Sequence, residues 1–390
     1  MLLVDNGSFF PEDDLHMPAA WFLMDAMKVL HTDAVGVGDR ELRFGLQYLR
    51  AQIKRTGLSL VCANLYEKAT KKPALQPYVI KDVNGIKVGI FGLMSDKADV
   101  GPARDSLYVV EPSNVSIATI REMRKKGATV IVLLSQLGKI ESEDLVTAVD
   151  GVDALIVGRN VPMIQTGRMI KNTVACYGGE QGQYLGRTIL TMGPRNKVVN
   201  GSNEMFILGP ETGEKKEVAD LVREFEDGFN AMLARKEKET AAATALSDST
   251  KNAPDHFLGA ETCIRCHASE GEQWKKTAHA RAWATLVDRK KDSTPDCVPC
   301  HVVGYKQPGG FGANTTGVNM TNVQCENCHG MGTQHEAFAA NPQKLTEGTC
   351  IACHTSSTSP EFDFAKFKPY VDHAHLASSL PPLNTKKVMK

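Results

Sequence analysis

The stretch Cys263-Ile264-Arg265-Cys266-His267 decides how the C-terminal third of this chain folds, because its pattern of two cysteines and a histidine occurs four times there. The other copies are Cys297-Val298-Pro299-Cys300-His301, Cys325-Glu326-Asn327-Cys328-His329 and Cys350-Ile351-Ala352-Cys353-His354. Cys-x-x-Cys-His is the attachment sequence of c-type haem. The spacing lets both thiols reach the vinyl groups of one porphyrin and sets the histidine under the iron. We therefore expect four covalent haems c, with these proximal ligands: His267, His301, His329 and His354.

Two other chemistries use paired cysteines. Zinc ribbons also contain Cys-x-x-Cys pairs, which are separated by about 20 residues. Zinc, however, gives no reason for a histidine to follow the second cysteine in all four copies, and neither does a disulfide framework. The agreement of every copy with the attachment motif therefore favours haem.

The same segment holds five further histidines that can bind the opposite faces of the irons. They are His256, His279, His335, His373 and His375. Methionine is scarce there, so we expect bis-histidine ligation, which gives lower reduction potentials than methionine ligation. We predict one helix over residues 271–290, rigid enough to hold the His279 imidazole over a haem face. The choice between His373 and His375 stays open.

The first 235 or so residues alternate strand and helix signals. Short β-branched runs at 58–62, 129–134 and 153–157 are typical of buried strands. Helical periodicity occurs at 18–30, 41–55, 113–126 and 141–149. Asn84-Gly85 lies between two further strand-like runs and predicts a hairpin. These patterns predict an α/β domain with a mixed sheet, closed by a charged helix at about 214–238.

Length and composition favour two domains. A chain of 390 residues, 42% hydrophobic and 23% charged, is globular and too long for one ordinary compact unit. Its formal net charge of zero gives no indication of a nucleic-acid or anionic-membrane partner. No apolar run of about 18 residues is present, so we expect no membrane span. Residues 239–254 are small and polar without a period, which predicts a linker between domains at 1–238 and 255–390.

The residues around the four motifs resemble a known family. After the first motif come Trp274 and His279-Ala280, then Cys-Val-Pro-Cys-His-Val-Val-Gly-Tyr, a glycine-rich loop, and Val-Gln-Cys-Glu-Asn-Cys-His-Gly. Over about residues 255–376 this order resembles the tetrahaem cytochromes typified by the electron acceptor of hydroxylamine oxidoreductase. The resemblance implies a mostly helical or irregular multihaem domain, closely stacked haem pairs, and electron transfer with other cytochromes or quinol-linked reductases. One haem of the type member has no distal side chain, so an open iron is also compatible with the resemblance.

Six segments of the first domain resemble the 5'-nucleotidase-like branch of the calcineurin-type metallophosphatases. They lie in the family's order and spacing at residues 3–10, 37–42, 61–65, 134–138, 153–161 and 179–187. The resemblance implies an α/β sandwich and a cleft that holds two divalent metals. The family ligates these metals through Gly-Asp, Gly-Asn-His-Glu, Ser-His-Leu-Gly and Gly-His-x-His motifs.

Other residues occupy those ligand positions here. They are Ser8, Asp39-Arg40, Gln136, and Arg159 with Val161. Two-metal hydrolysis needs two cations a few ångströms apart, and hard divalent ions need carboxylates and imidazoles. We therefore expect no metal here, no catalytic residue and no phosphoesterase activity. Arg40 and Arg159 are candidates for binding a phosphate or sulfur oxyanion, but surface salt bridges are the interpretation we favour.

Three functions follow from these patterns. The first is an electron carrier with a non-catalytic phosphatase-like domain. The second is a redox enzyme that uses a five-coordinate haem on a small nitrogen or sulfur oxyanion, and the third is a bifunctional phosphoesterase–cytochrome. Five spare histidines for four irons favour the carrier.

Haem c is attached outside the cytoplasmic membrane, so we expect a periplasmic, extracellular or cell-surface protein. A signal sequence, and the family's first Asp-x-His strand, are accordingly expected upstream of Met1. Cys62 and Cys176 lie outside the four motifs and form either buried thiols or a disulfide. We also expect the haem-containing segment to be self-contained once residues 1–238 are removed.

Overall fold

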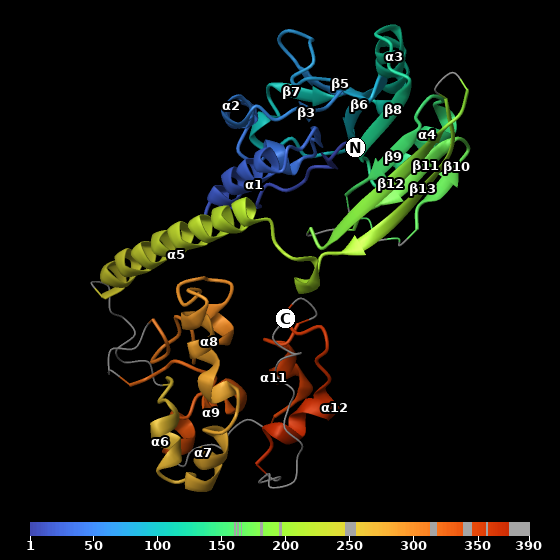
Figure 1. Cartoon of the computed structure of the whole chain (residues 1–390). Coiled ribbons are helices and arrows are strands. Elements are labelled where there is room, and N and C mark those ends of the chain that lie inside the picture. The colour runs from blue at the N-terminus through green and yellow to red at the C-terminus, as the bar shows by residue number, and fades with distance from the viewer. Residues whose placement is uncertain are drawn as a thin grey trace. The chain divides into compact units, whose positions relative to one another are not determined.

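The chain divides into two compact units, Met1–Phe225 and Glu226–Lys390, which we call the N-terminal unit and the C-terminal unit (Figure 1). The fold comes from a computed structural model. It describes residues 1–159, 161, 164, 166–179, 182–194, 197–245, 255–312, 318–337, 345–355 and 358–373.

The larger sheet of the N-terminal unit has six strands. These are β5 (Tyr78–Val83), β6 (Ile86–Met94), β8 (Val130–Gln136), β9 (Ala154–Val157), β10 (Arg168–Ile170) and β11 (Thr173–Tyr177). Their order is β10-β11-β9-β8-β6-β5, with a parallel centre and antiparallel edge strands. Asn84 (φ 52°) and Gly85 (φ 83°) join β5 to β6. Both are in the left-handed conformation that a tight hairpin turn requires, which confirms the predicted hairpin.

A second, smaller sheet packs against the first. It consists of three parallel strands, β1 (Val4–Asp5), β2 (Ala34–Gly36) and β3 (Leu60–Val61). The two sheets approach so closely at Gly92 of β6 that a Cβ there would lie 2.1 Å from the carbonyl oxygen of Val61. A short antiparallel pair, β4 (Leu65–Glu67) and β7 (Leu107–Val109), lies beside them. Together these elements confirm the predicted mixed α/β architecture.

Helices cover the sheets close to the positions that the sequence periodicity predicts. They are α1 (Met17–Val29), α2 (Leu46–Thr56), α3 (Pro112–Lys125) and α4 (Lys139–Ala148). The helix predicted at 41–55 is interrupted. Its first residues form a 3-10 turn, Arg40–Leu42, and Gly45 at φ 83° starts α2 afresh.

A long hairpin and a long helix complete the first 245 residues. The hairpin pairs β12 (Tyr184–Met192) with β13 (Val198–Ile207), and the helix is α5 (Lys216–Ala245). The first part of the predicted linker is helical, because residues 239–245 continue α5. Alanine has the highest helix propensity, and this stretch is alanine-rich. The rest of the predicted linker, 246–254, lies outside the described residues.

The division into units also differs from the predicted domain boundary at 238. The C-terminal unit begins at Glu226, within α5. In that unit Lys290 pairs with Asp227 (2.7 Å), and the Thr294 hydroxyl donates to Asn230 (3.2 Å). Residues of α5 thus contribute contacts to the C-terminal unit, so a boundary at 238 cuts through packed structure.

Beyond α5, the described part of the C-terminal unit consists of short helices and irregular segments, as predicted. Its hydrophobic cluster is small and centres on Leu286, Val298 and Val302. Such a small apolar core agrees with a unit whose interior is filled by something other than side chains. The helices are α6 (Ala260–Ile264), α7 (Ala268–Trp274), α8 (Ala282–Asp288), α9 (Cys325–His329), α10 (Thr333–Glu336), α11 (Glu347–Ile351) and α12 (Phe364–Phe367).

The continuous helix predicted over 271–290 is wrong. The segment breaks after α7, and His279 begins a 3-10 turn, His279–Arg281, that leads into α8. The Thr277 hydroxyl donates to the carbonyl of Trp274 (2.7 Å) and accepts from the N–H of Ala280 (3.4 Å). Side-chain bonds of this kind compete with the helical backbone pattern, and here they redirect the chain just before His279.

Two further observations concern the whole described chain. No helix within it is long and apolar enough to span a bilayer. Cys62 and Cys176 are buried free thiols rather than a disulfide. The Cys176 thiol lies 3.1 Å from the Thr188 hydroxyl, and Cys62 contacts Asn64.

Candidate functional site

Three motif histidines each face a second imidazole. The ring centroids are 6.1 Å apart for His267 and His335, 6.2 Å for His354 and His279, and 6.2 Å for His329 and His373. A metal–imidazole bond is about 2 Å long and the ring centroid lies about 1.1 Å beyond the nitrogen, so imidazoles on opposite sides of one ion have centroids about 6 Å apart. The observed spacing fits a bis-histidine iron.

The Nδ1 atoms of three site imidazoles are already bonded to acceptors within the protein. The partners are the Ala282 carbonyl for His301 (2.7 Å), the Ser359 hydroxyl for His354 (2.9 Å) and the Gln273 amide oxygen for His373 (2.7 Å). A hydrogen bond at Nδ1 fixes the tautomer and leaves Nε2 free for a metal. Sequence reasoning did not identify Gln273 or Ser359, because nothing in the chain marks a polar residue as the support of a distant ligand.

Burial keeps the imidazole of His279 in the form that binds metals. The burial of this ring, aided by the nearby His354 and His301, lowers the pKa of His279 to about 4. Burial also lowers the pKa of His354. Because metal ligation requires the neutral imidazole, both rings are ready to bind iron without first losing a proton at neutral pH.

The cysteines bring the four motifs together in two pairs. A hydrogen bond between the Cys263 and Cys325 thiols, together with burial, raises the pKa of Cys263. Burial and a hydrogen bond with Cys300 raise the pKa of Cys353 to about 12. The first motif therefore lies against the third, and the second against the fourth. This arrangement agrees with the stacked haem pairs that the family resemblance implies.

The structure does not place two of the five candidate distal ligands, His256 and His375, opposite a motif histidine. Among the described residues, neither His256 nor His301 faces another imidazole. His256 is held through its backbone N–H, which donates to the Thr333 hydroxyl (3.1 Å). His375 lies outside the described residues. The structure therefore brings His279, His335 and His373 to motif histidines.

The predicted metal-ligand positions Ser8, Gln136 and Arg159 lie at or just after the carboxyl ends of β1, β8 and β9, where α/β folds place their ligands. Here the predicted ligand positions bond to one another. Ser8 Oγ donates to Gln136 Oε1 (3.0 Å), and Gln136 Nε2 donates to the carbonyl of Asn6 (2.6 Å). A Cβ at Gly158 would lie 2.3 Å from Asn6 Nδ2, so the cluster is closely packed. Ser8 and Gln136 are therefore bonded within a closely packed cluster of neutral groups.

The two arginines at the predicted ligand positions have partners of opposite charge. Arg159 lies 3.5 Å from Asp39, and Arg40 lies 3.3 Å from Glu12. These pairs support the salt-bridge interpretation of the two arginines over an anion site. Val161, at the other position of the histidine pair, is buried.

Acidic side chains near these positions accept hydrogen bonds from backbone N–H groups. Glu41 is fully buried and accepts hydrogen bonds from the N–H groups of Gly38 (2.7 Å) and Phe9 (2.9 Å). Burial raises the pKa of Glu41 and that of Asp5. No group of three or more histidine, cysteine or acidic residues suited to a metal occurs within the described part of the chain.

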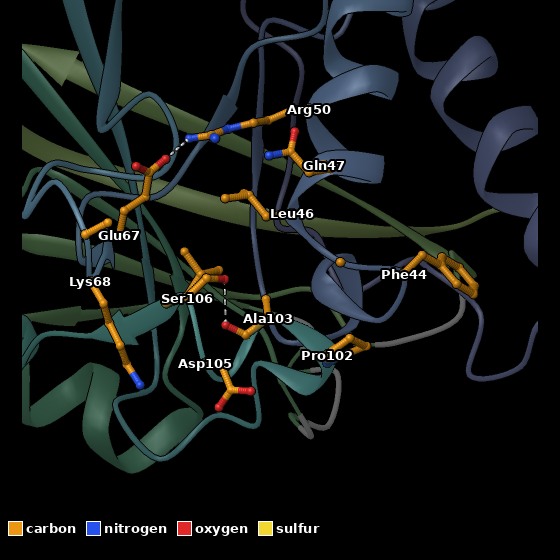
Figure 2. A pocket seen from close by; sticks show the side chains of 13 residues that line it. Phe44, Leu46, Gln47, Arg50, Glu67, Lys68, Pro102, Ala103, Asp105 and Ser106 are labelled. Atoms are coloured by element: carbon orange, nitrogen blue, oxygen red, sulfur yellow. Dashed lines mark hydrogen bonds and ion pairs between the residues drawn. The ribbon is translucent and has the colours of Figure 1, made fainter.

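A separate open depression of about 820 Å³ lies between α2 and the loop before β7 (Figure 2). Several of its polar groups bond to one another or to the backbone. Arg50 bonds to Glu67 (2.5 Å) and to the carbonyl of Ala74, and the Ser106 hydroxyl donates to the carbonyl of Ala103. None of the predicted metal-ligand positions lines it, and we assign it no chemistry.

Comparison with known proteins identifies the C-terminal part. The family model of cytochrome c554 and c-prime matches residues 262–330. Cytochrome c-554 of Nitrosomonas europaea is 31% identical over 173 residues, which cover 34% of this chain and 74% of that protein. The chain belongs to the cytochrome c554 family. Membership of the cytochrome c554 family implies covalently bound haem c, which the histidine pairs and bonded Nδ1 atoms described above fit.

The N-terminal part of this chain resembles a different group of proteins. Protein UshA of Yersinia enterocolitica is 29% identical over 152 residues, which cover 38% of this chain but only 25% of that protein. A 5'-nucleotidase precursor from Thermus thermophilus superposes with a TM-score of 0.53 at 20% identity, covering 59% of this chain and 50% of the other. These matches confirm the metallophosphoesterase-like α/β fold.

Proposed function

We propose that this protein is an electron carrier with four covalently attached haems c, and that its phosphatase-like domain does not hydrolyse phosphate esters. The observation that carries the proposal is the spacing of 6.1–6.2 Å between motif histidines and His335, His279 and His373. An iron held by two such imidazoles would have no position left for a substrate. Such a site suits electron transfer rather than catalysis on a bound molecule.

The protein's own residues perform defined tasks in this function. Haem c supplies a one-electron couple when bound. The motif cysteines would attach the haems, the motif histidines together with His335, His279 and His373 would hold the irons of three of them, and Gln273 and Ser359 orient imidazoles through Nδ1. The contacts of Cys263 with Cys325 and of Cys353 with Cys300 support close pairs of haems, which fast electron exchange requires.

We propose that the N-terminal domain retains the metallophosphoesterase-like fold without phosphoesterase activity. The hydrogen bond from Ser8 to Gln136 and the ion pair of Arg159 with Asp39 support this, because residues bonded in this way do not offer a dinuclear metal site. A role in docking or assembly agrees with such a domain.

The proposed setting is outside the cytoplasm, where haem c is attached to apoproteins. The redox partners we propose are other cytochromes or quinol-linked reductases. No observation on the described residues indicates nucleic acid as a partner.

A second function is a redox enzyme that acts on a small nitrogen or sulfur oxyanion at the haem of the second motif. It is favoured by His301, the one motif histidine that faces no other imidazole among the described residues. His301 is nevertheless oriented for ligation, because its Nδ1 lies 2.7 Å from the carbonyl of Ala282.

Mass spectrometry and low-temperature electron paramagnetic resonance of the holoprotein test both functions. We expect four haem increments that survive acid-acetone extraction and at least three low-spin ferric signals. A fourth low-spin signal supports the pure carrier, whereas a high-spin signal that responds to an added oxyanion supports the enzyme. Three or fewer haems, or bound zinc, contradict the central claim.

A further inference from the structure

A buried acidic side chain lies inside the third attachment motif. Glu326 of Cys325-Glu326-Asn327-Cys328-His329 is 4% exposed. Its carboxylate accepts hydrogen bonds from the backbone N–H groups of Leu258 (3.0 and 3.1 Å), Gly259 (2.8 Å) and Gly332 (2.8 Å). Because all these partners are donors, both oxygens act only as acceptors, as in an ionised carboxylate.

The negative charge of Glu326 is not neutralised by a side chain. No lysine, arginine or histidine of the described residues forms an ion pair with it, so backbone dipoles alone stabilise it. Acidic residues at the surface are screened by water and salt, whereas a buried charge acts over several ångströms with little screening. Glu326 therefore imposes a lasting negative potential on its surroundings.

Those surroundings are the first and third haem attachment segments. Glu326 directly follows Cys325, and its partners Leu258 and Gly259 lead into α6, which carries Cys263. Gly332 leads into α10, which carries His335, the imidazole opposite His267. The carboxylate thus bonds to the segments that lead into the first motif and into His335, and it lies within the attachment loop of the third motif.

The other motifs have no counterpart of this charge. Their two central residues are Ile264-Arg265, Val298-Pro299 and Ile351-Ala352. The third motif alone places a carboxylate between its cysteines. Within the third motif Glu326 lies next to Cys325, whose thiol bonds to Cys263, and its carboxylate bonds directly to the segment that leads into the first motif, so the charge acts most strongly on the haems of these two motifs.

We propose that the Glu326 carboxylate lowers the reduction potentials of the haems attached at Cys263/Cys266 and Cys325/Cys328, and so biases electrons toward the pair at the second and fourth motifs. Adding one electron to a ferric haem removes one unit of positive charge. A nearby buried anion therefore stabilises the ferric form and opposes reduction. The inference rests on the proposed loading with four haems.

The test is a potentiometric titration of the full-length holoprotein with Glu326→Gln. We expect two of the four one-electron components to move to higher potential. The expected shift is at least a tenfold change in the ferric-to-ferrous ratio at a fixed ambient potential, which is 59 mV for one electron. The other two components should stay in place. The matched control is Glu261→Gln, which removes an exposed carboxylate two residues before Cys263 and should change the ratio less than twofold.

Two more variants separate charge from packing. Glu326→Asp keeps the charge but shortens the side chain, and it should leave the potentials near those of the wild type; an equal shift in both variants contradicts the proposal. If Glu326→Gln fails to retain haem, Leu258→Lys adds an ammonium beside the intact carboxylate and should raise the same two components. Unmoved potentials in a four-haem variant overturn this inference alone, whereas a wild-type count below four overturns the proposed function.

Discussion

The imidazole of His373 lies opposite that of His329, with ring centroids 6.2 Å apart and an interplanar angle of 22°. His329 belongs to the third attachment motif, and His373 lies near the end of the described chain. Gln273 on α7 holds this distal segment twice: its amide oxygen contacts His373 Nδ1 (2.7 Å), and its amide nitrogen donates to the carbonyl of Asp372 (3.0 Å). One side chain thus fixes both the position and the tautomer of the distal ligand.

We expect His373→Ala to convert one low-spin haem to a high-spin one, because the iron loses its second imidazole. Electron paramagnetic resonance of the ferric holoprotein should show one low-spin signal lost and a high-spin signal gained. The matched control is His375→Ala, which should keep the signal that His373→Ala loses. The opposite pattern would assign the distal position to His375 and contradict the geometry.

Gln273 should tune the same haem without binding it. Gln273→Glu offers a carboxylate to His373 Nδ1, which makes the imidazole more basic, so one component of the redox titration should move to lower potential. Gln273→Leu removes the acceptor and should move that component the other way. Gln273 variants that shift no component, with all four haems retained, would mean that the hydrogen bond positions the chain only.

The sequence predicts contacts that are local and misses those that the tertiary fold creates. The proximal ligands are predictable because each histidine directly follows the cysteines of its own motif. The β5–β6 hairpin is predictable because Asn84-Gly85 permits the tight turn that it requires. The pairing of His267 with His335 depends on how separate short helices pack, which no local pattern encodes. The break before His279 arises from Thr277 side-chain bonds that compete with a genuine helical periodicity.

Cutting the chain at Glu226 should give a more stable haem-containing fragment than cutting at residue 239. The longer fragment keeps Asp227 and Asn230, which contact the C-terminal unit, and Leu233, which is 3% exposed. Burying one leucine contributes about 2 kcal/mol, and the exposed Lys290–Asp227 pair at most about 1 kcal/mol. Urea titrations of the two haem-loaded fragments should differ by about 2 kcal/mol in free energy of unfolding. Equal values would show that α5 contributes nothing to this unit.

The N-terminal domain should show no manganese- or zinc-dependent hydrolysis of nucleotides or simple phosphate esters. Ser8 and Gln136 bond to each other, and Arg159 pairs with Asp39, so two cations have no set of carboxylates and imidazoles to bind. Assays with added manganese should give the same background rate with and without chelator. Chelator-sensitive turnover well above background would instead support the bifunctional enzyme.

A repair experiment sharpens this last prediction. Restoring histidine with Arg40→His and Gln136→His together should not restore activity, because Ser8 still replaces the Gly-Asp carboxylate. Gln136→His also removes the amide that bonds to Ser8 and to the carbonyl of Asn6, so the cluster loses two hydrogen bonds without gaining a metal. Isothermal titration with manganese should detect no binding to the double variant. Activity in that variant would show that two added imidazoles suffice to bind the two cations. It would also show that the hydrogen-bonded network of Ser8, Gln136 and Asn6 does not mark a permanent loss of phosphoesterase activity.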